Sequence, residues 1–146
     1  MKRIAFILLV FFLAQSAHSQ ITRGSSVPPN YVQQQFQRNF PDAEEVRWNS
    51  PRYGFSASFF QRGYAMTAFF SEEGDWMSTR ISIPESQIPN DAMRHYRDNY
   101  PGFRITETVF HDATGDSYYC IFIASRSSER ELHYDDNGNF IRVVNR

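Results

Sequence analysis

Cysteine is almost absent from this chain of 146 residues, which contains Cys120 and no other cysteine. A single thiol cannot form an intramolecular disulfide, so the sequence excludes a disulfide-stapled scaffold. Cys120 lies in the apolar run Tyr118–Ile123, which is typical of a small hydrophobic residue in a buried strand. The alternative is a reactive thiol, which needs a nearby base or helix N-terminus, and the neighbouring sequence shows neither.

Lysine is also nearly missing, because Lys2 is the only one. Residues 20–146 contain 13 basic side chains, all arginine, against 16 acidic ones, so their formal net charge is −3. Proteins that bind nucleic acid generally carry clustered positive charge that neutralises phosphates. The composition therefore argues against nucleic acid as a partner.

Long apolar runs are missing except at the N-terminus, where Ile4–Ala14 is an unbroken run of 11 residues. Two basic residues precede this run, and the small-x-small sequence Ala17-His18-Ser19 follows it. This layout is typical of a cleaved secretory signal peptide. The run is shorter than the roughly 20 apolar residues that span a bilayer as a helix. We therefore expect a signal peptide over residues 1–19 and no membrane insertion after its removal.

The sequence after the apolar run indicates the destination of the protein. Residues 20–26 are polar and are expected to form a loose N-terminal tail. No cysteine stands directly after the run, which excludes lipid attachment to a mature N-terminal cysteine. We therefore expect an exported protein without a lipid anchor, in the periplasm or secreted.

Two segments that lie 60 residues apart resemble each other. Pro29–Pro41 and Pro89–Pro101 both begin with Pro-Asn and end with Asn-aromatic-Pro. A second match, offset by 64 residues, relates Phe69–Trp76 to His133–Phe140. A unit of about 60 residues buries too little surface to be more than marginally stable alone. The sequence therefore predicts a tandem repeat whose two units share one core.

Each unit is expected to be a helix followed by an antiparallel meander, in residues 27–83 and 84–146. Apolar residues at helical spacing form a stripe in each expected helix, namely Val32, Phe36, Phe40 and then Ala92, Tyr96, Tyr100. Pro29 and Pro89 suit the first helical turn, whereas Pro41 and Pro101 disfavour helix in the residue before them and so end each helix. Alternating patterns and turn residues predict eight strands: Glu44–Trp48, Phe55–Phe60, Tyr64–Phe70, Trp76–Ile83, Arg104–Phe110, Ser117–Ala124, Glu129–Tyr134 and Phe140–Val144. A longer turn is expected at His111–Asp116, and the linker at Ser82–Gln87.

The chain contains a set of short motifs in this order: Phe40-Pro41, Val46-Arg47-Trp48, Ala57-x-Phe59, Phe69–Trp76, Ile88-Pro89, Tyr100-Pro101-Gly102, Ile105 and Tyr134–Gly138. With these motifs the chain resembles the PepSY-like, beta-lactamase-inhibitor-like family of small exported bacterial proteins over about residues 27–144. The resemblance implies an α+β fold in which two helix-plus-meander units share one continuous sheet, with the helices on one face. It also implies a binding or inhibitory role outside the cytoplasm, and it supplies no catalytic residues.

Motifs for catalysis, metals and cofactors are missing. The acidic turns Glu72–Asp75 and Asp135–Asn139 lack the first and twelfth ligands of a calcium loop, so they are interpreted as solvated hairpin turns. His95, His111 and His133 have no metal-motif spacing along the chain. Nucleophile elbows and phosphate loops are absent. We therefore expect no enzyme activity, metal or cofactor, although a hydrolase site assembled by the fold stays open as an alternative.

Aromatic residues are the most informative, because residues 20–146 contain 21 of them. Several expected strands are apolar on both faces, and one helix per unit covers only one face. Long side chains can cover the other face, or that face can present aromatic and arginine anchors to a partner. The candidates for such a binding face are Arg47, Trp48, Tyr53, Tyr64, Trp76 and Arg80.

The function that follows is a non-enzymatic exported module that binds, or inhibits, another envelope or extracellular protein through the open sheet face. The alternative is a carrier or sensor that holds a small ligand, peptide or glycan between the two repeats. A broad aromatic face suits a protein, whereas a concave pocket of about 300 Å³ or more suits a small molecule.

Overall fold

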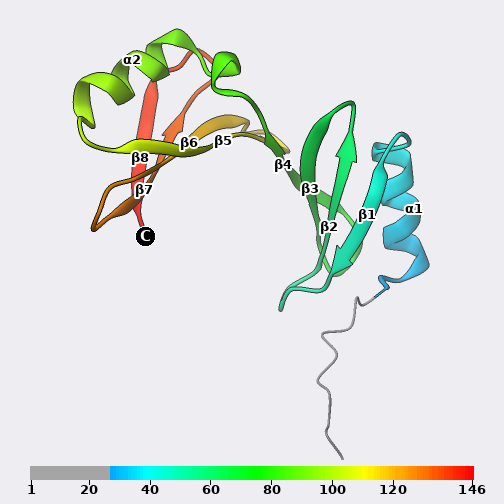
Figure 1. The fold of residues 1–146 in the computed structure, drawn as a ribbon. Coiled ribbons are helices and arrows are strands. Elements are labelled where there is room, and N and C mark those ends of the chain that lie inside the picture. The colour runs from blue at the N-terminus through cyan, green and yellow to red at the C-terminus, as the bar shows by residue number, and fades with distance from the viewer. Residues whose placement is uncertain (1–26) are drawn as a thin grey trace, which may run out of the picture.

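In residues 27–146, eight strands pair in chain order into one antiparallel sheet, and two α-helices accompany it (Figure 1). This computed structural model describes residues 27–146, so the expected signal peptide and polar tail lie outside the described residues. The first half contains α1 (Asn30–Asn39), β1 (Glu44–Asn49), β2 (Phe55–Gln61), β3 (Tyr64–Phe70) and β4 (Trp76–Ser82). The second half contains the 3-10 turn η1 (Glu85–Gln87), α2 (Asn90–Asn99), β5 (Arg104–Ala113), β6 (Tyr118–Ala124), β7 (Glu129–Tyr134) and β8 (Phe140–Asn145). The predicted α+β class and the continuous antiparallel sheet are confirmed.

The two helices begin and end with the same local chemistry. Pro29 and Pro89 are the N-cap residues and have extended backbone angles. The sequence predicts them in the first helical turn, so each lies one position earlier than expected. Each helix closes on an aromatic residue, where the Phe40 amide donates to the Phe36 carbonyl at 2.8 Å. A proline follows each of these aromatic residues and prevents the helix from continuing.

Both helices pack on the same face of the sheet. Val32 and Phe36 of α1 are buried against β2 and β3, through Ala57, Phe59, Ala68 and Phe70. Ala92 of α2 is buried with Ile121, Ile123, Leu132 and Tyr134 of β6 and β7. Figure 1 shows α1 beside β1, and α2 over the part of the sheet formed by β6–β8. The fold therefore has one helix-covered face and one on which no helix of residues 27–146 packs, called the helix-free face below.

Strand β5 joins the two halves and is longer than the sequence predicts. It pairs with β4 from Ser82↔Val109 to Ser78↔Ala113, and with β6 on its other side. The expectation that His111–Asp116 forms one long turn is therefore wrong in its first three residues. Strand β4 pairs with all three of these residues, and β6 pairs with His111 through Tyr118, which the local sequence does not show.

Candidate functional site

The strand register defines which side chains occupy the helix-free face. Arg47 of β1 lies opposite Ser58, and the same row continues across the sheet through Thr67, Arg80, His111 and Tyr118. Because side chains alternate along a strand, the adjacent row points toward the helices; it comprises Trp48, Ala57, Ala68 and Thr79. Polar and charged side chains thus cross the helix-free face from β1 to β6.

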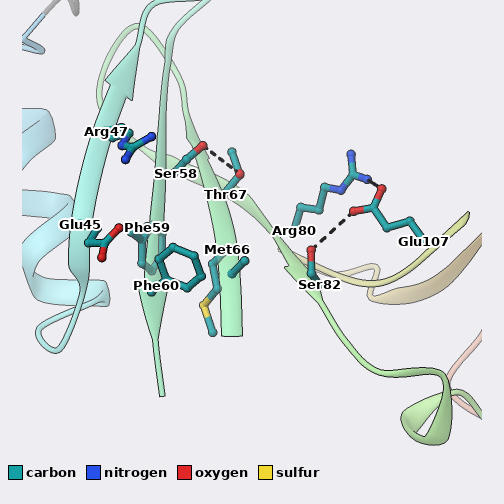
Figure 2. A pocket seen from close by; sticks show the side chains of 11 residues that line it. Glu45, Arg47, Ser58, Phe59, Phe60, Met66, Thr67, Arg80, Ser82 and Glu107 are labelled. Carbon is teal, nitrogen blue, oxygen red and sulfur yellow. Dashed lines mark hydrogen bonds and ion pairs between the residues drawn. The ribbon is translucent and has the colours of Figure 1, made fainter. Parts of the chain in front are cut away.

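A hollow of about 410 Å³ lies on the helix-free face between β1 and β5 (Figure 2). Its lining includes Glu45, Arg47, Ser58, Phe60, Arg80 and Glu107. The Arg80 guanidinium lies 2.5 Å from the Glu107 carboxylate, and the Ser58 and Thr67 hydroxyls lie 3.1 Å apart. Phe60 keeps 47% of its surface exposed. A ring flanked by charged and hydrogen-bonding groups is suited to contact with another protein.

The helix-free face is covered by its own side chains in the second half. Val109, Cys120 and Phe122 form a small buried cluster there. The guanidinium groups of Arg80 and Arg146 each lie 4.9 Å from the centre of the Phe122 ring. Their long side chains cover apolar surface and add cation–π attraction. Both explanations given for this face therefore apply, each to a different part of the sheet. Long side chains cover the face over β5–β7, whereas the face over β1–β4 stays exposed.

Within the covered part, β6 and β7 bring together a thiol, a carboxylate and an imidazole. Cys120 pairs directly with His133 in the register, and Glu131 lies two residues earlier on the same face. The His133 Nε2 atom is 2.8 Å from Glu131 Oε1, and the Cys120 thiol donates to the same oxygen at 3.5 Å. Arg146 Nη2 donates to the other carboxylate oxygen at 2.8 Å. Glu131 is thus the shared acceptor of this network.

The electrostatics of this network disfavour a nucleophilic thiol. Burial, reinforced by the neighbouring Glu131 carboxylate, raises the pKa of Cys120 far above its usual value. Burial alone would raise the pKa of Glu131, but hydrogen bonds from Arg146 and His133 outweigh it and lower that pKa. The thiol is therefore protonated and donates to a carboxylate, rather than being activated by a base. The arrangement is unlike that of a cysteine hydrolase.

Three of the predicted binding-face residues lie on the helix-free side. Arg47 and Arg80 line the hollow described above. Tyr53, in the loop before β2, is 76% exposed and borders a second depression of about 330 Å³ with Phe69 and Met77. The structure thus extends the exposed surface from the hollow toward the Tyr53 loop.

The other three predicted residues are on the helix-covered face, so the expectation that they line the open face is wrong. Trp48 packs against Phe36, with ring centroids 5.2 Å apart. The Trp76 indole N–H donates to the Thr79 hydroxyl at 2.9 Å, and the Tyr64 hydroxyl accepts from the Gln87 amide at 2.6 Å. Register shifts in the β1–β2 and β3–β4 pairs change the parity near both tryptophans, so alternation alone could not assign their faces.

The sequence interpretation missed Phe60, Phe69 and Glu107 as parts of this surface. A signal was present for Phe60, since it follows Ser56 and Ser58 at alternate positions and so shares their polar face. Glu107 had no such signal, because only the pairing of β4 with β5 brings its strand beside Arg80.

A groove also lies on the helix-covered face, between the C-terminal end of α1 at Asn39 and the 3-10 turn at Gln87. It consists of two cavities of about 370 and 420 Å³, both lined by Gln61, Met66 and Ile81. Within the part of the chain that the structure describes, the buried Oε1 atom of Gln61 has no hydrogen-bond partner. The groove is of a size that a small molecule requires.

The fold defines a small α+β protein with one antiparallel sheet and a helix-free face. The chain belongs to the beta-lactamase-inhibitor-like, PepSY-like family, whose profile matches residues 53–142. This family is a non-enzymatic, inhibitor-like kind of protein, which indicates a non-catalytic binding module. The resemblance seen in the sequence motifs is thereby confirmed.

Solved structures share the fold. A DUF2874 family protein from Bacteroides uniformis has a TM-score of 0.75 at 16% identity, covering 82% of this chain and 90% of that one. A BLIP-like protein from Bacteroides fragilis has a TM-score of 0.74 at 12% identity, covering 82% and 86%. A protein described as periplasmic, from Bacteroides eggerthii, has a TM-score of 0.75 at 13% identity, covering 82% and 89%.

A search of curated proteins and the character of the helices complete the description. No match is found among the curated proteins. In residues 27–146, neither helix combines the length and the apolar character that crossing a membrane demands.

Proposed function

We propose that the protein is an exported, non-enzymatic module that binds another envelope or extracellular protein through its helix-free face. The observation that carries this proposal is the hollow over β1–β5, which combines the exposed Phe60 ring with Arg47 and the Arg80–Glu107 ion pair. Aromatic and arginine side chains dominate the energetics of protein interfaces. The description of the family as beta-lactamase-inhibitor-like supports inhibition as the mode of action.

The proposed location is the periplasm or the extracellular space. The signal-peptide layout of residues 1–19 supports export. The similar protein from Bacteroides eggerthii is described as periplasmic, which supports the same compartment. The partner is accordingly sought among exported proteins.

The proposed architecture is a tandem repeat of one helix-plus-meander unit, and matched contacts support it. The hairpin turn after β3 approaches the start of α1, where Gly74 leaves room for the Tyr31 ring. The turn after β7 approaches the start of α2 in the same way, where Gly138 lies against Pro89. Both turns close with a backbone hydrogen bond, from the Gly74 amide to Ser71 at 3.1 Å and from the Gly138 amide to Asp135 at 2.9 Å.

Photo-cross-linking in the source organism tests the binding face directly. A photoreactive phenylalanine at position 60 is expected to give one discrete cross-linked protein, because Phe60 borders the hollow and its ring is exposed. The same probe at the exposed position 97, on α2, serves as the control and is expected to give none.

The partner identified in this way permits a quantitative test of the same face. Arg47→Glu is expected to weaken its binding by at least about 30-fold, the size of an interface hot spot, while Arg97→Glu leaves binding unchanged. Both side chains are exposed, so neither change should disturb folding. Cross-links from position 97 alone, or equal affinities of the two variants, would contradict the proposal.

The groove on the helix-covered face supports a second candidate function, the capture of a small ligand, peptide or glycan. The observation that favours it is the buried Oε1 atom of Gln61, a residue that lines both cavities, because this atom has no hydrogen-bond partner within residues 27–146. Under this alternative, a ligand screen by thermal shift finds a compound that raises the Tm. Filling the groove with Met66→Trp removes that rise, whereas Arg47→Glu preserves it.

A further inference from the structure

We propose that Cys120, Glu131 and His133 form a Zn²⁺ site on the helix-free face. One ligand atom from each side chain lies within 4.8 Å of the other two. Glu131 and His133 are alternate residues of β7, so both point to the same face, and Cys120 lies directly opposite His133 on β6. The backbone of two paired strands therefore brings the three donors together. This site is independent of the proposed binding function.

The donor set fits zinc chemistry. Zinc binds cysteine sulfur at about 2.3 Å, and histidine nitrogen and carboxylate oxygen at about 2.0–2.2 Å, with tetrahedral geometry. Donors at these distances lie about 3.4 Å apart across a tetrahedral ion. The separations here are 3.5 Å from sulfur to oxygen and 2.8 Å from nitrogen to oxygen. A small opening of the His133–Glu131 contact therefore admits the ion.

The surroundings of the three donors support a built site. Arg146 holds the second Glu131 oxygen at 2.8 Å, which leaves Oε1 directed at Cys120 and His133. Such an outer hydrogen bond fixes the orientation of a ligating carboxylate. Cys120 and His133 retain only 3% and 4% of their exposed surface, so bulk water competes little for the ion.

The charges and protons of the binding step balance. The Cys120 thiol loses its proton to solvent as the zinc–sulfur bond forms, and neutral His133 and the Glu131 carboxylate each donate a lone pair. Thiolate and carboxylate together neutralise the charge of Zn²⁺, which lowers the free energy required to bury the ion. Three protein ligands leave the fourth tetrahedral position to a water molecule.

Cobalt substitution tests the site with a spectroscopic signature. Titration of the purified protein with Co²⁺ is expected to produce a thiolate-to-metal charge-transfer band and visible d–d bands, which Zn²⁺ then abolishes by displacement. His133→Ala and Glu131→Gln are expected to weaken Co²⁺ binding by more than about 100-fold, beyond the effect of losing an outer-shell partner. Arg146→Gln is expected to weaken it by about 10- to 100-fold.

His111→Ala is the matched control for these variants. His111 stacks on the other side of Tyr118 from His133, on the same face, so this change removes a nearby imidazole without touching the three donors. The control is expected to retain both cobalt bands and the rise in Tm that Zn²⁺ causes.

Several outcomes would overturn the site. One is the absence of a charge-transfer band in the folded wild-type protein. Another is equal metal affinity in wild type and Glu131→Gln, with circular dichroism confirming that both are folded. A rise in Tm with Zn²⁺ that is unaffected by His133→Ala would assign the metal to other side chains.

Discussion

Replacing Phe36 with alanine is expected to lower the free energy of unfolding by about 3–5 kcal/mol, the usual cost of removing a buried aromatic ring. Phe36 is one of the two residues of α1 that are buried in the first core. Its ring centroid lies 5.0–6.3 Å from those of Phe59, Trp48, Phe40 and Phe70. Three strands and the helix therefore lose a shared contact when this ring is removed.

Phe60→Ala is the matched control for Phe36→Ala, because it removes the same ring from the helix-free face. Phe60 is about half exposed, and its removal is expected to cost less than about 1 kcal/mol. Urea denaturation followed by circular dichroism measures both values from the transition midpoints and slopes. Comparable losses for the two variants would show that the assignment of the two faces is incorrect.

Gly54→Ala is expected to destabilise the protein by about 2–5 kcal/mol, through backbone strain and overpacking together. Gly54 has a φ angle of +87°, which is unfavourable for a residue with a Cβ atom. An added Cβ would also overlap the carbonyl oxygen of Phe70, which belongs to the backbone and cannot rotate away. Phe70 pairs with Phe55, so the clash separates β2 from β3 at the start of their ladder.

Gly63→Ala separates the two contributions to this effect. Gly63 has a similar φ angle of +82°, but nothing lies within 4 Å of its added Cβ. Its replacement is expected to cost about 1–2 kcal/mol, the penalty for the left-handed conformation alone. Thermal unfolding of both variants gives the difference as a shift in Tm. A Gly63→Ala variant as unstable as Gly54→Ala would rule out the close approach to Phe70 as the cause.

Local patterns in the sequence were sufficient for the elements themselves. Tyr64–Phe70 and Glu129–Tyr134 have the predicted bounds, because turn residues punctuate both ends of each strand. The helical stripe built on Val32 and Phe36 does face the sheet, as its spacing of four residues predicts. The burial of Cys120 was also predictable from the apolar residues on both sides of it.

The pairing of strands decided what alternation could not. Residues on one strand share a face with residues on the next only through the register, and an irregularity in that register reverses the assignment. Trp48 lies on the helix-covered face because its row continues through Ala57 and Ala68. Trp76 lies there because the shift in the β3–β4 pair places it opposite Phe70. Arg47 and Arg80 share the helix-free face because one row of the ladder joins them through Ser58 and Thr67.

The two candidate sites could not be predicted from local sequence patterns, because both depend on the pairing of strands. Glu107 is 27 residues from Arg80 along the chain, yet pairs with it through the contact of β4 with β5. Cys120 and His133 show no metal-motif spacing, yet they face each other across β6 and β7. Helices and strands follow from short-range periodicity, whereas a site made from several strands depends on long-range hydrogen bonding that only the folded sheet establishes.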